Sequence, residues 1–555
     1  MIVSSISIVE PDVVVDKDWW RGAVIYQIYP RSYQDSNHDG IGDLAGIKDR
    51  LPHIAELGAD AIWISPFFKS PMKDFGYDVS NYKDIDPMFG DLFAFDELIE
   101  HAHALDLKVM VDLVLSHTSD QHSWFAQSSS SRDNDRHDWY VWADAKPDGG
   151  PPNNWLSIFG GPGWSWHSTR CQYYQHNFLS SQPDLNFHNP DVQDALLDVA
   201  HFWLDRGVDG FRLDTINFYF CDAELRDNPG LPPELRNADI APEVNPYNHQ
   251  EHLFDKNRPE NINFLKRFRA VLDEYPAATA VGEVGDAQQG MQILQDYTRD
   301  DDRVHMCYTF DFLSAELPTA ERVGAVLQKF EVEAGDSWVC WAFSNHDVVR
   351  HATRWKIPKK HYAQHLKMLA SLLMSMRGSV CLYQGEELGL PEGDVPFERL
   401  QDPYGIAFWP KFKGRDGCRT PMVWDHESEH AGFSTEEPWL PVSEVHKRLS
   451  VSHQSGDQNS LLEHYRRFLS FRRDCLPLIK GTLHGIVVIG DVLSFLRTHE
   501  DQTVYCAFNM GNVRVRCEIN TDQKLSLMPG HGFDAELGDG VLEIPPYSAA
   551  FVQIG

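Results

Sequence analysis

The feature that most constrains the fold of this chain is an alternation of short apolar runs with stretches of helical periodicity. The apolar runs are bounded by Gly, Pro, Asn or Asp, which is typical of buried strands. Strands that alternate with helices indicate parallel βα units. The pattern predicts strands at residues 23–29, 59–65, 108–115, 208–213, 279–284, 306–312, 338–343 and 379–384, with helices between them at 44–57, 93–105, 191–205, 263–274 and 361–376.

This pattern predicts an α/β fold, a (β/α)8 TIM barrel, whose active site gathers at the C-terminal ends of the strands. The alternation stops at 118–187, a segment rich in Ser, Asp, Gly, Trp and Pro, which predicts an inserted irregular subdomain after strand 3. After a helix at 461–474 the apolar period becomes two, at 485–497, 503–509, 513–519 and 547–554. That change predicts a C-terminal antiparallel β-sandwich domain.

The expected domain organisation follows from these changes of pattern. We expect an N-terminal tail at 1–18, because its apolar patch is too short to span a bilayer and lacks the basic start of a signal peptide. The remaining boundaries are a barrel formed by 19–117 and 188–478, an inserted subdomain at 118–187 and an all-β C-terminal domain at 479–555.

Two charged residues stand at the end of the fourth strand. Arg212 and Asp214 are two positions apart, so their side chains are expected on the same face. An Arg beside a carboxylate keeps it ionised at neutral pH, as a nucleophile requires. A purely structural ion pair is the alternative. Asp112 lies inside an apolar strand, where a charge needs a partner such as an Arg, and we interpret it as structural.

Two more acids, Glu283 and Asp347, stand at the ends of other predicted strands, together with His117 and His346. Three converging acids push their proton affinities apart, so that one stays ionised while another holds a proton. Cleavage of a glycosidic bond with retention of configuration needs that division. A divalent-metal hydrolase or isomerase is the weaker alternative, because Arg212 beside the acids disfavours a cation and the histidines are far apart in sequence.

A loop after the first strand places oxygen side chains at alternate positions, with glycines that permit a tight turn. This pattern suits a hard cation, so we expect a structural Ca²⁺ or Mg²⁺. A plain polar turn is the alternative. An EF-hand is excluded, because Gly46 stands where its twelfth-position Glu is required. The expected ligands are Asp35, Asn37, Asp39, the carbonyl of Ile41, and Asp43.

The composition limits the possible binding partners and the cellular compartment. A formal net charge of -33 makes nucleic acid or an anionic membrane an unsuitable partner. The nine cysteines are scattered and odd in number, and no two form a CxxC pair, which favours a reduced, cytoplasmic setting. We expect no organic cofactor.

At these residues the sequence resembles the α-amylase family of glycoside hydrolases, glycoside hydrolase family 13, and in particular its α-glucosidase and oligo-1,6-glucosidase branch. The resemblance covers roughly residues 19–555. The matching motifs begin at Asp112, Gly210, Gln182, Val281, Ser344 and Gly414, and they read DLVLSH, GFRLDT, QPDLN, VGEV, SNHD and GRDGCRTPM.

The resemblance implies a role for each matching position. Asp214 would be the nucleophile, Glu283 the general acid and later base, and Asp347 the residue that holds the 2- and 3-hydroxyls. Arg212, His117 and His346 would bind hydroxyls around the anomeric centre. The remaining expected substrate-binding residues are Asp74 and Arg415, which would close the pocket, Tyr77, which would stack on the glucose ring, and Phe159 and Phe178, as aromatic walls.

The resemblance implies a hydrolase of carbohydrate metabolism, a retaining α-glucosidase, and the closed pocket that it implies would make the enzyme exo-acting. The expected substrates are maltose and short oligosaccharides, with sucrose as a further candidate, and transglycosylation is expected as a side reaction. Thr215 resembles the maltase-type members rather than the 1,6-specific ones, which carry Val, so α-1,4 links are expected to be preferred over α-1,6. An excursion at 222–248 is expected to restrict substrates to short ones. Two alternatives remain. One is a sucrose-active or dedicated transglucosylase. The other, a non-catalytic, transporter-associated homologue, is disfavoured because all three acids are kept and no long apolar run is found.

Overall fold

The computed structural model describes residues 16–555 except 237, 239, 287 and 334, so most of the expected tail at 1–18 lies outside the described residues. Its centre is a parallel sheet of eight strands in the order β11-β10-β9-β5-β2-β1-β13-β12. A parallel bridge between Cys307 and Val339 joins the two edge strands, so the sheet closes into the predicted barrel. The strands are β1 (Val24–Ile28), β2 (Ala61–Ile64), β5 (Lys108–Leu113), β9 (Gly210–Leu213), β10 (Thr279–Val284), β11 (Met306–Thr309), β12 (Cys340–Ala342) and β13 (Ser379–Tyr383).

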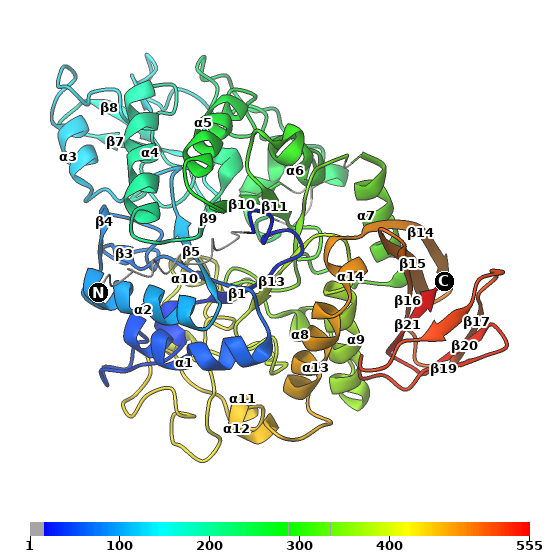
Figure 1. Ribbon diagram of the computed structural model, residues 1–555. Helices are drawn as coiled ribbons and strands as arrows, with labels where there is room; N and C mark the ends of the chain where they lie inside the picture. Colours follow the sequence, from blue (N-terminus) through cyan, green and yellow to red (C-terminus); the bar gives the residue numbers. More distant parts are fainter. Residues whose placement is uncertain (1–15, 237, 239, 287, 334) are drawn as a thin grey trace, which may run out of the picture.

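Helices pack around the barrel, as Figure 1 shows. Several begin at a residue whose side chain accepts a hydrogen bond from the first turn: Asp43 accepts from the backbone of Gly46, and Asp91 from that of Ala94. Pro190 at the first position of α4 favours its start there. The helices are α1 (Leu44–Leu57), α2 (Leu92–Ala104), α4 (Pro190–Leu204), α5 (Asn261–Asp273), α6 (Gly290–Thr298), α7 (Ala320–Glu333), α8 (His351–Arg354), α9 (Tyr362–Leu373) and α13 (Leu461–Arg473).

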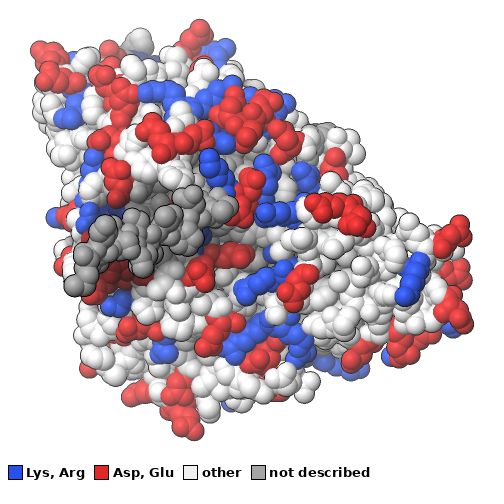
Figure 2. All heavy atoms as spheres, in the orientation of Figure 1, with Lys and Arg blue, Asp and Glu red and all other residues white. Residues whose placement is uncertain are grey.

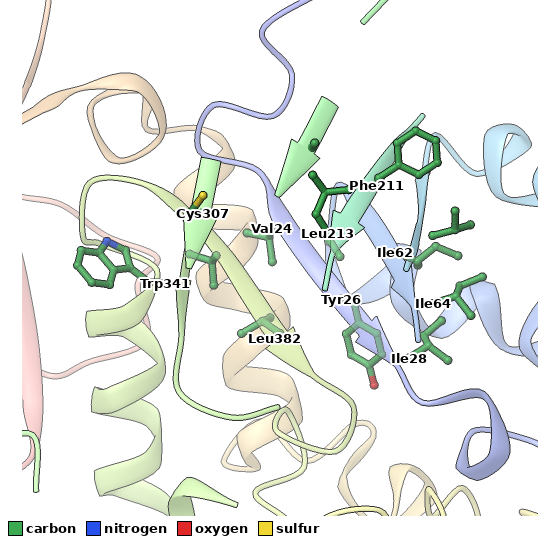
Figure 3. Close-up of a cluster of buried hydrophobic side chains, with 14 of the residues drawn as sticks. Val24, Tyr26, Ile28, Ile62, Ile64, Phe211, Leu213, Cys307, Trp341 and Leu382 are labelled. Carbon is green, nitrogen blue, oxygen red and sulfur yellow. The ribbon is translucent and has the colours of Figure 1, made fainter. Parts of the chain in front are cut away.

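Alternation along each strand sorts side chains into two cores. On β1, Val24, Tyr26 and Ile28 point outward and pack under the helices, with Phe211 and Leu213 of β9 in the same layer (Figure 3). A second cluster fills the barrel interior, with Ile25, Trp63, Met110, Val281, Met306 and Tyr308 among its members. Residues two positions further along these inward rows therefore emerge at the C-terminal mouth of the barrel.

The insertion after β5 is less irregular than expected. It contains α3 (Ser123–Ser130) and a three-stranded antiparallel sheet in the order β6-β8-β7. These strands are β6 (Trp142–Ala143), β8 (Gln172–Gln175) and β7 (Trp164–His167). A further short hairpin, β3 (Phe68–Lys69) with β4 (Asn81–Ile85), follows β2. In Figure 1 the insertion lies on the opposite side of the barrel from the C-terminal strands.

The C-terminal domain consists of two antiparallel sheets, in the orders β14-β15-β16-β21-β18 and β17-β20-β19. The prediction of one strand at 485–497 is wrong: the chain turns at Gly490 and Asp491, and two paired strands result. Three short strands were not predicted, β18 (Leu525–Leu527), β19 (Glu536–Gly538) and β20 (Val541–Ile544). The other strands are β14 (Thr482–Ile489), β15 (Val492–His499), β16 (Gln502–Asn509), β17 (Val515–Glu518) and β21 (Ser548–Ile554).

Shorter helices complete the chain. They are α10 (Pro403–Phe408), α11 (Glu444–Lys447), α12 (Val451–Gln454) and α14 (Leu476–Lys480). Among the described residues, no helix is long and apolar enough to cross a membrane. Acidic and basic side chains are interspersed on the face drawn in Figure 2, despite the net charge of -33.

Candidate active site

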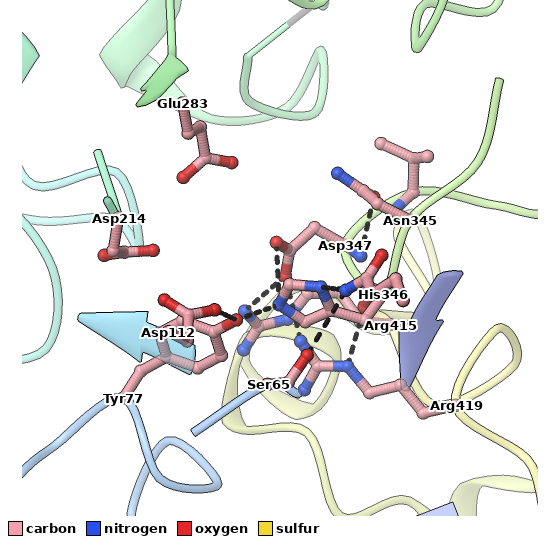
Figure 4. Close-up of polar contacts among 12 residues, drawn as sticks. Ser65, Tyr77, Asp112, Asp214, Glu283, Asn345, His346, Asp347, Arg415 and Arg419 are labelled. Carbon is pink, nitrogen blue, oxygen red and sulfur yellow. Dashed lines mark hydrogen bonds and ion pairs between the residues drawn. The ribbon is translucent and has the colours of Figure 1, made fainter. Parts of the chain in front are cut away.

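The catalytic candidates meet at the C-terminal mouth of the barrel. Asp214 follows β9, Glu283 is the second-last residue of β10, and Asp347 follows β12, and all three line one cavity. Figure 4 shows their carboxylates around a common space. The alternation of β9 brings Arg212 and Asp214 to the same side, as predicted, because Phe211 and Leu213 take the outward positions.

Arg212 connects the acids. Its guanidinium is fully buried and binds Asp112 at 3.0 Å, hydrogen-bonds to Asp214, and lies 2.6 Å from Glu283 Oε2. The prediction that Asp112 pairs with an Arg is therefore confirmed. Because the terminal nitrogens of one guanidinium contact both Asp214 and Glu283, those two carboxylates are close neighbours.

Burial sets the proton affinity of this pair. The side chains of Asp214 and Glu283 are 7% and 5% exposed, and burial raises the pKa of each to about 7, against the lowering effect of Arg212. The two therefore titrate in the same range and hold about one proton between them near neutrality. Arg212 donates a hydrogen bond to Asp214 and makes an ion pair with Glu283, so its charge lowers the pKa of both acids.

Asp347 has the opposite electrostatic environment. Burial alone would raise its pKa, but the Nε2 contact of His346 and the positive charges of Arg415 and Arg419 outweigh burial and hold the pKa of Asp347 well below its usual range. Arg419 donates to its Oδ1 at 2.9 Å and Arg415 at 3.2 Å. Asp347 is therefore an ionised acceptor throughout the neutral range.

His346 is aligned by its neighbours. The amide of Gln27 lies 2.7 Å from its Nδ1, so the ring hydrogen is on Nε2, which faces the hydroxyl of Tyr77 at 2.6 Å and Asp347 at 3.1 Å. The Tyr77 ring stacks on that of His346, with centroids 5.2 Å apart. Burial lowers the pKa of His346, so the ring is neutral.

An ion-pair network lines part of the cavity. Arg415 donates to Asp74 at 2.7 Å and to Asp402 at 2.9 Å, as well as to Asp347. Phe159 lies over the Arg415 guanidinium at 5.1 Å, and Phe178 packs against Phe159. Asp74, Arg415 and both phenylalanines line the cavity.

Thr215 links the two catalytic candidates. Its backbone N–H donates to Glu283 Oε2 at 3.1 Å, and its hydroxyl donates to Asp214 Oδ2 at 3.2 Å. The residue has φ +40°, in the left-handed region that a β-branched side chain rarely adopts. Such strain is tolerated where the surroundings fix the backbone, and it recurs at functional sites.

The structure brings nearly all predicted substrate-binding residues to this cavity. Asp74, Tyr77, His117, Phe159, Phe178, Thr215 and Arg415 line it. Arg212 and His346 are instead fully buried, behind the acids that they align, so their direct contact with a sugar stays a prediction.

Several residues of the site were not predicted. Gln182 donates to Asp74 at 3.1 Å, and its place in the QPDLN motif was the available signal. Arg419 lies in the GRDGCRTPM motif. Tyr308 and Gln27 belong to no motif quoted above, and only their inward position on a barrel strand indicates a role. The lining also includes Phe218, Ile240, Phe310, Val348 and Tyr404.

The predicted cation loop lies outside this cavity. Asp35 accepts hydrogen bonds from the backbone of His38 and Gly40, and Asp43 caps α1, while Asn37 and Asp39 each accept from the backbone two residues on. An all-oxygen donor set fits Ca²⁺ or Mg²⁺. Within the described part of the chain, no group of three or more His, Cys, Asp or Glu side chains is placed to hold a metal ion. The cation, with Ile41 as a carbonyl ligand, therefore stays a prediction.

Comparisons with known proteins identify the family of this chain. A family model described as the catalytic domain of alpha amylase matches residues 27–481. The chain is 62% identical to a protein of Rhizobium meliloti (strain 1021) named "Probable alpha-glucosidase", over 99% of this chain and 98% of that protein. It is 36% identical to an oligo-1,6-glucosidase of Heyndrickxia coagulans, over 97% and 99% of the two chains.

Solved structures show the same relationship. An α-glucosyl transfer enzyme superposes with a TM-score of 0.93 at 49% identity, over 97% of this chain and 99% of that one. A trehalulose synthase superposes with a TM-score of 0.85 at 29% identity, over 97% and 99%. The chain belongs to the α-amylase family of glycoside hydrolases, in its α-glucosidase and oligo-1,6-glucosidase branch, and it is a glycoside hydrolase.

Proposed function

We propose that the protein is a retaining, exo-acting α-glucosidase that removes one glucose residue from the non-reducing end of short α-glucosides. The observation that carries the proposal is a pair of buried acids bridged by Arg212, in a cavity that the Asp74–Arg415 ion pair lines. Neighbouring carboxylates suit retention, which uses a separation of about 5–5.5 Å, rather than inversion, which needs about 6.5–9.5 Å. We infer that this ion pair closes the pocket, which suits removal of a single terminal sugar.

The proposed reaction has two steps. Asp214 attacks the anomeric carbon while Glu283 gives its proton to the glycosidic oxygen, which leaves with the alcohol. Water then attacks the glucosyl-enzyme, and Glu283 takes the proton back. Asp347, ionised and held by Arg415 and Arg419, would accept hydrogen bonds from the sugar's 2- and 3-hydroxyls.

The anomeric form of the first product tests this proposal. We expect nuclear magnetic resonance to show α-glucose as the initial product of maltose. Asp214→Asn is expected to lower the release of nitrophenol from p-nitrophenyl α-glucoside by about 10⁴-fold or more. Asp205→Asn, a substitution on the surface after α4, is the matched control and should keep full activity. Initial β-glucose, or undiminished release by Asp214→Asn, would refute the proposal.

We further propose that α-1,4 links are preferred over α-1,6, because Thr215 places a hydroxyl rather than a methyl group beside Asp214. Named relatives include both oligo-1,6-glucosidases and a maltase of Drosophila melanogaster, so family membership alone does not decide the linkage. Thr215→Val is expected to lower the ratio of the rate on maltose to the rate on isomaltose by about 10-fold or more. Faster cleavage of isomaltose by the wild type would contradict the preference.

Transglucosylation is the second proposed activity. It is supported by the similarity to an α-glucosyl transfer enzyme, and a sucrose-active or dedicated transglucosylase is the alternative. Glucosyl transfer and hydrolysis share the glucosyl-enzyme and differ in whether a sugar or water attacks it. Product analysis at high maltose and at high sucrose separates the cases: trisaccharides from maltose indicate transfer, and isomerised sucrose indicates the alternative.

A further inference from the structure

Tyr308 lies against the proposed general acid, although it belongs to none of the motifs above. It sits on β11 directly opposite Glu283 of β10 in the strand register, and its side chain points into the barrel interior. The residue is 2% exposed, and it is absent from the cavity lining. It is therefore placed to act on Glu283 from behind, without touching a substrate.

The direction of the Tyr308 hydroxyl follows from its hydrogen bonds. Its oxygen accepts from Arg212 Nε at 3.2 Å and from Arg212 Nη2 at 2.8 Å. An arginine side chain only donates, and a phenol oxygen has two lone pairs, so both lone pairs are used. The O–H must then donate to its third neighbour, Glu283 Oε1, at 3.0 Å.

The two oxygens of Glu283 have different partners. Oε1 accepts the Tyr308 hydrogen bond, which stabilises the carboxylate form. Oε2 accepts a hydrogen bond from the backbone of Thr215 at 3.1 Å and lies 2.6 Å from Arg212 Nη2. Burial raises the pKa of Tyr308 well above its usual value, so the hydroxyl keeps its own hydrogen.

We propose that Tyr308 is a positioning residue that orients the carboxyl group of Glu283 and stabilises its ionised form through the hydrogen bond to Oε1. This inference rests on the proposed function. In the first step the O–H bond of Glu283 breaks and its proton passes to the glycosidic oxygen. That oxygen also takes the electron pair of the breaking bond to the anomeric carbon, and a carboxylate electron pair of Asp214 forms the new bond. Tyr308 neither gains nor loses a proton. Its donation to Oε1 also stabilises the carboxylate that remains.

Tyr308→Phe tests the proposal through the pH profile. Glu283 must be protonated to act, so kcat/KM falls as pH rises through its pKa. Loss of a donor to the carboxylate should raise that pKa, and the basic limb of the profile should move up by about one unit. The rate on maltose, whose leaving group needs a proton, should fall about 10-fold or more, while the rate on α-glucosyl fluoride should change little.

Tyr26→Phe is the matched control. Tyr26 is an equally buried barrel tyrosine whose hydroxyl donates to Glu387 at 2.9 Å, and neither residue lines the catalytic cavity. Its removal should leave the pH profile unchanged. An unshifted basic limb in Tyr308→Phe, with equal losses on maltose and the fluoride, would show that Tyr308 only packs the barrel.

A double-mutant cycle separates this inference from the proposed function. If Tyr308 acts through Glu283, Tyr308→Phe should add no further loss to Glu283→Gln on maltose. Additive losses would overturn the inference alone, whereas an active Glu283→Gln would overturn the proposed function. If Tyr308→Phe does not fold, 3,5-difluorotyrosine can replace Tyr308 instead. Its hydroxyl is a stronger donor, so the basic limb of the pH profile should move to lower pH. An unchanged basic limb would refute the inference.

Discussion

At the scale of single residues, the active site is organised around one positive charge. Arg212 contacts three buried carboxylates, those of Asp112, Asp214 and Glu283. One guanidinium cannot neutralise all three, so burial leaves an excess of negative charge that a proton relieves. This imbalance raises the pKa of Glu283, the proposed general acid, to about 7, so the residue retains a proton near neutral pH. The arrangement favours catalysis at a cost in folding stability.

That cost gives a prediction about Glu283. Its folded pKa of about 7 exceeds the unfolded value of about 4.3, so the folded state binds more protons between those pH values and stability falls as pH rises through that window. Glu283→Gln removes this penalty. We expect its melting temperature to exceed that of the wild type by about 1–3 °C at pH 8 and to match it near pH 4.

Asp347 is expected to affect the pH dependence of folding stability in the opposite direction to Glu283. Its folded pKa is depressed, so its contribution to stability is present above the unfolded pKa and is lost as pH falls through the folded pKa. Asp347→Asn should therefore lower the melting temperature at pH 8, where Glu283→Gln raises it. Melting curves of both variants at pH 8 check the assignment, and shifts of the same sign would contradict it.

At the scale of secondary-structure elements, the sequence allowed the barrel and its acids to be predicted because both follow from the alternation of side chains. The period of two at Phe211, Arg212 and Leu213 already places Arg212 inward, and the strand ends place the acids. Contacts across strands were not predictable in the same way. The pairing of Tyr308 with Glu283 depends on the register between β10 and β11, which no local pattern encodes.

The errors in the C-terminal domain have a similar origin. The run 485–497 is apolar on both sides of Gly490 and Asp491, so a tight hairpin looks like one long strand. Gly490 has φ +58°, which permits the turn. Strands of three or four residues, such as β18 and β20, are too short to show a period and become strands only by pairing with a neighbour.

The excursion at 222–248 gives a prediction about substrate length. Asn245 is buried and donates to the carbonyl of Ile158 in the insertion at 2.6 Å and to the hydroxyl of Tyr404 at 3.1 Å, and Ile240 lines the cavity. Asn245→Ala should weaken the attachment of residues 222–248 over the cavity, because a buried hydrogen bond contributes about 1 kcal/mol. The ratio of the rate on maltohexaose to the rate on maltose should then rise about threefold or more.

The control for this test is Asn248→Ala, which removes contacts of the same loop to its own carbonyls at 241 and 242. It should leave the ratio unchanged. A wild-type enzyme that cleaves maltohexaose as efficiently as maltose would show that the excursion imposes no restriction on length.

The loop at residues 35–43 carries the proposed cation. If Ca²⁺ or Mg²⁺ binds there, millimolar cation should raise the melting temperature of chelator-treated protein, because a ligand that binds only the folded state stabilises it. Asp39→Ala should abolish that rise and leave kcat unchanged, since the loop does not line the catalytic cavity. Asp148→Ala, in an exposed turn, should keep the rise. An equal response in Asp39→Ala and wild type would exclude this loop as the site.

At the scale of the whole molecule, the barrel and the C-terminal domain share one core. The main cluster of buried hydrophobic residues runs from the barrel helices into the sandwich, where Phe468 of α13 packs on Phe551 of β21 at 5.5 Å. β14 and β15 also pack on α7, and β21 on α9 (Figure 1). A core without a break between the domains implies that they unfold together.

Arg497 tests this coupling, because it joins the two domains by hydrogen bonds as well as by packing. It is fully buried on β15 and donates to the carbonyl of Ser375 at 2.6 Å and to that of Gly481 at 2.9 Å. Arg497→Met keeps the apolar volume but leaves both carbonyls unpaired, at a cost of about 2–4 kcal/mol. Calorimetry should show a single transition in the wild type, with equal calorimetric and van't Hoff enthalpies, and a single transition at a lower temperature in the variant.

Arg514→Met, which removes an exposed arginine of the same domain, should change the melting temperature little, because exposed ion pairs contribute little. Two resolved transitions in the wild type would mean that the C-terminal domain unfolds independently of the barrel.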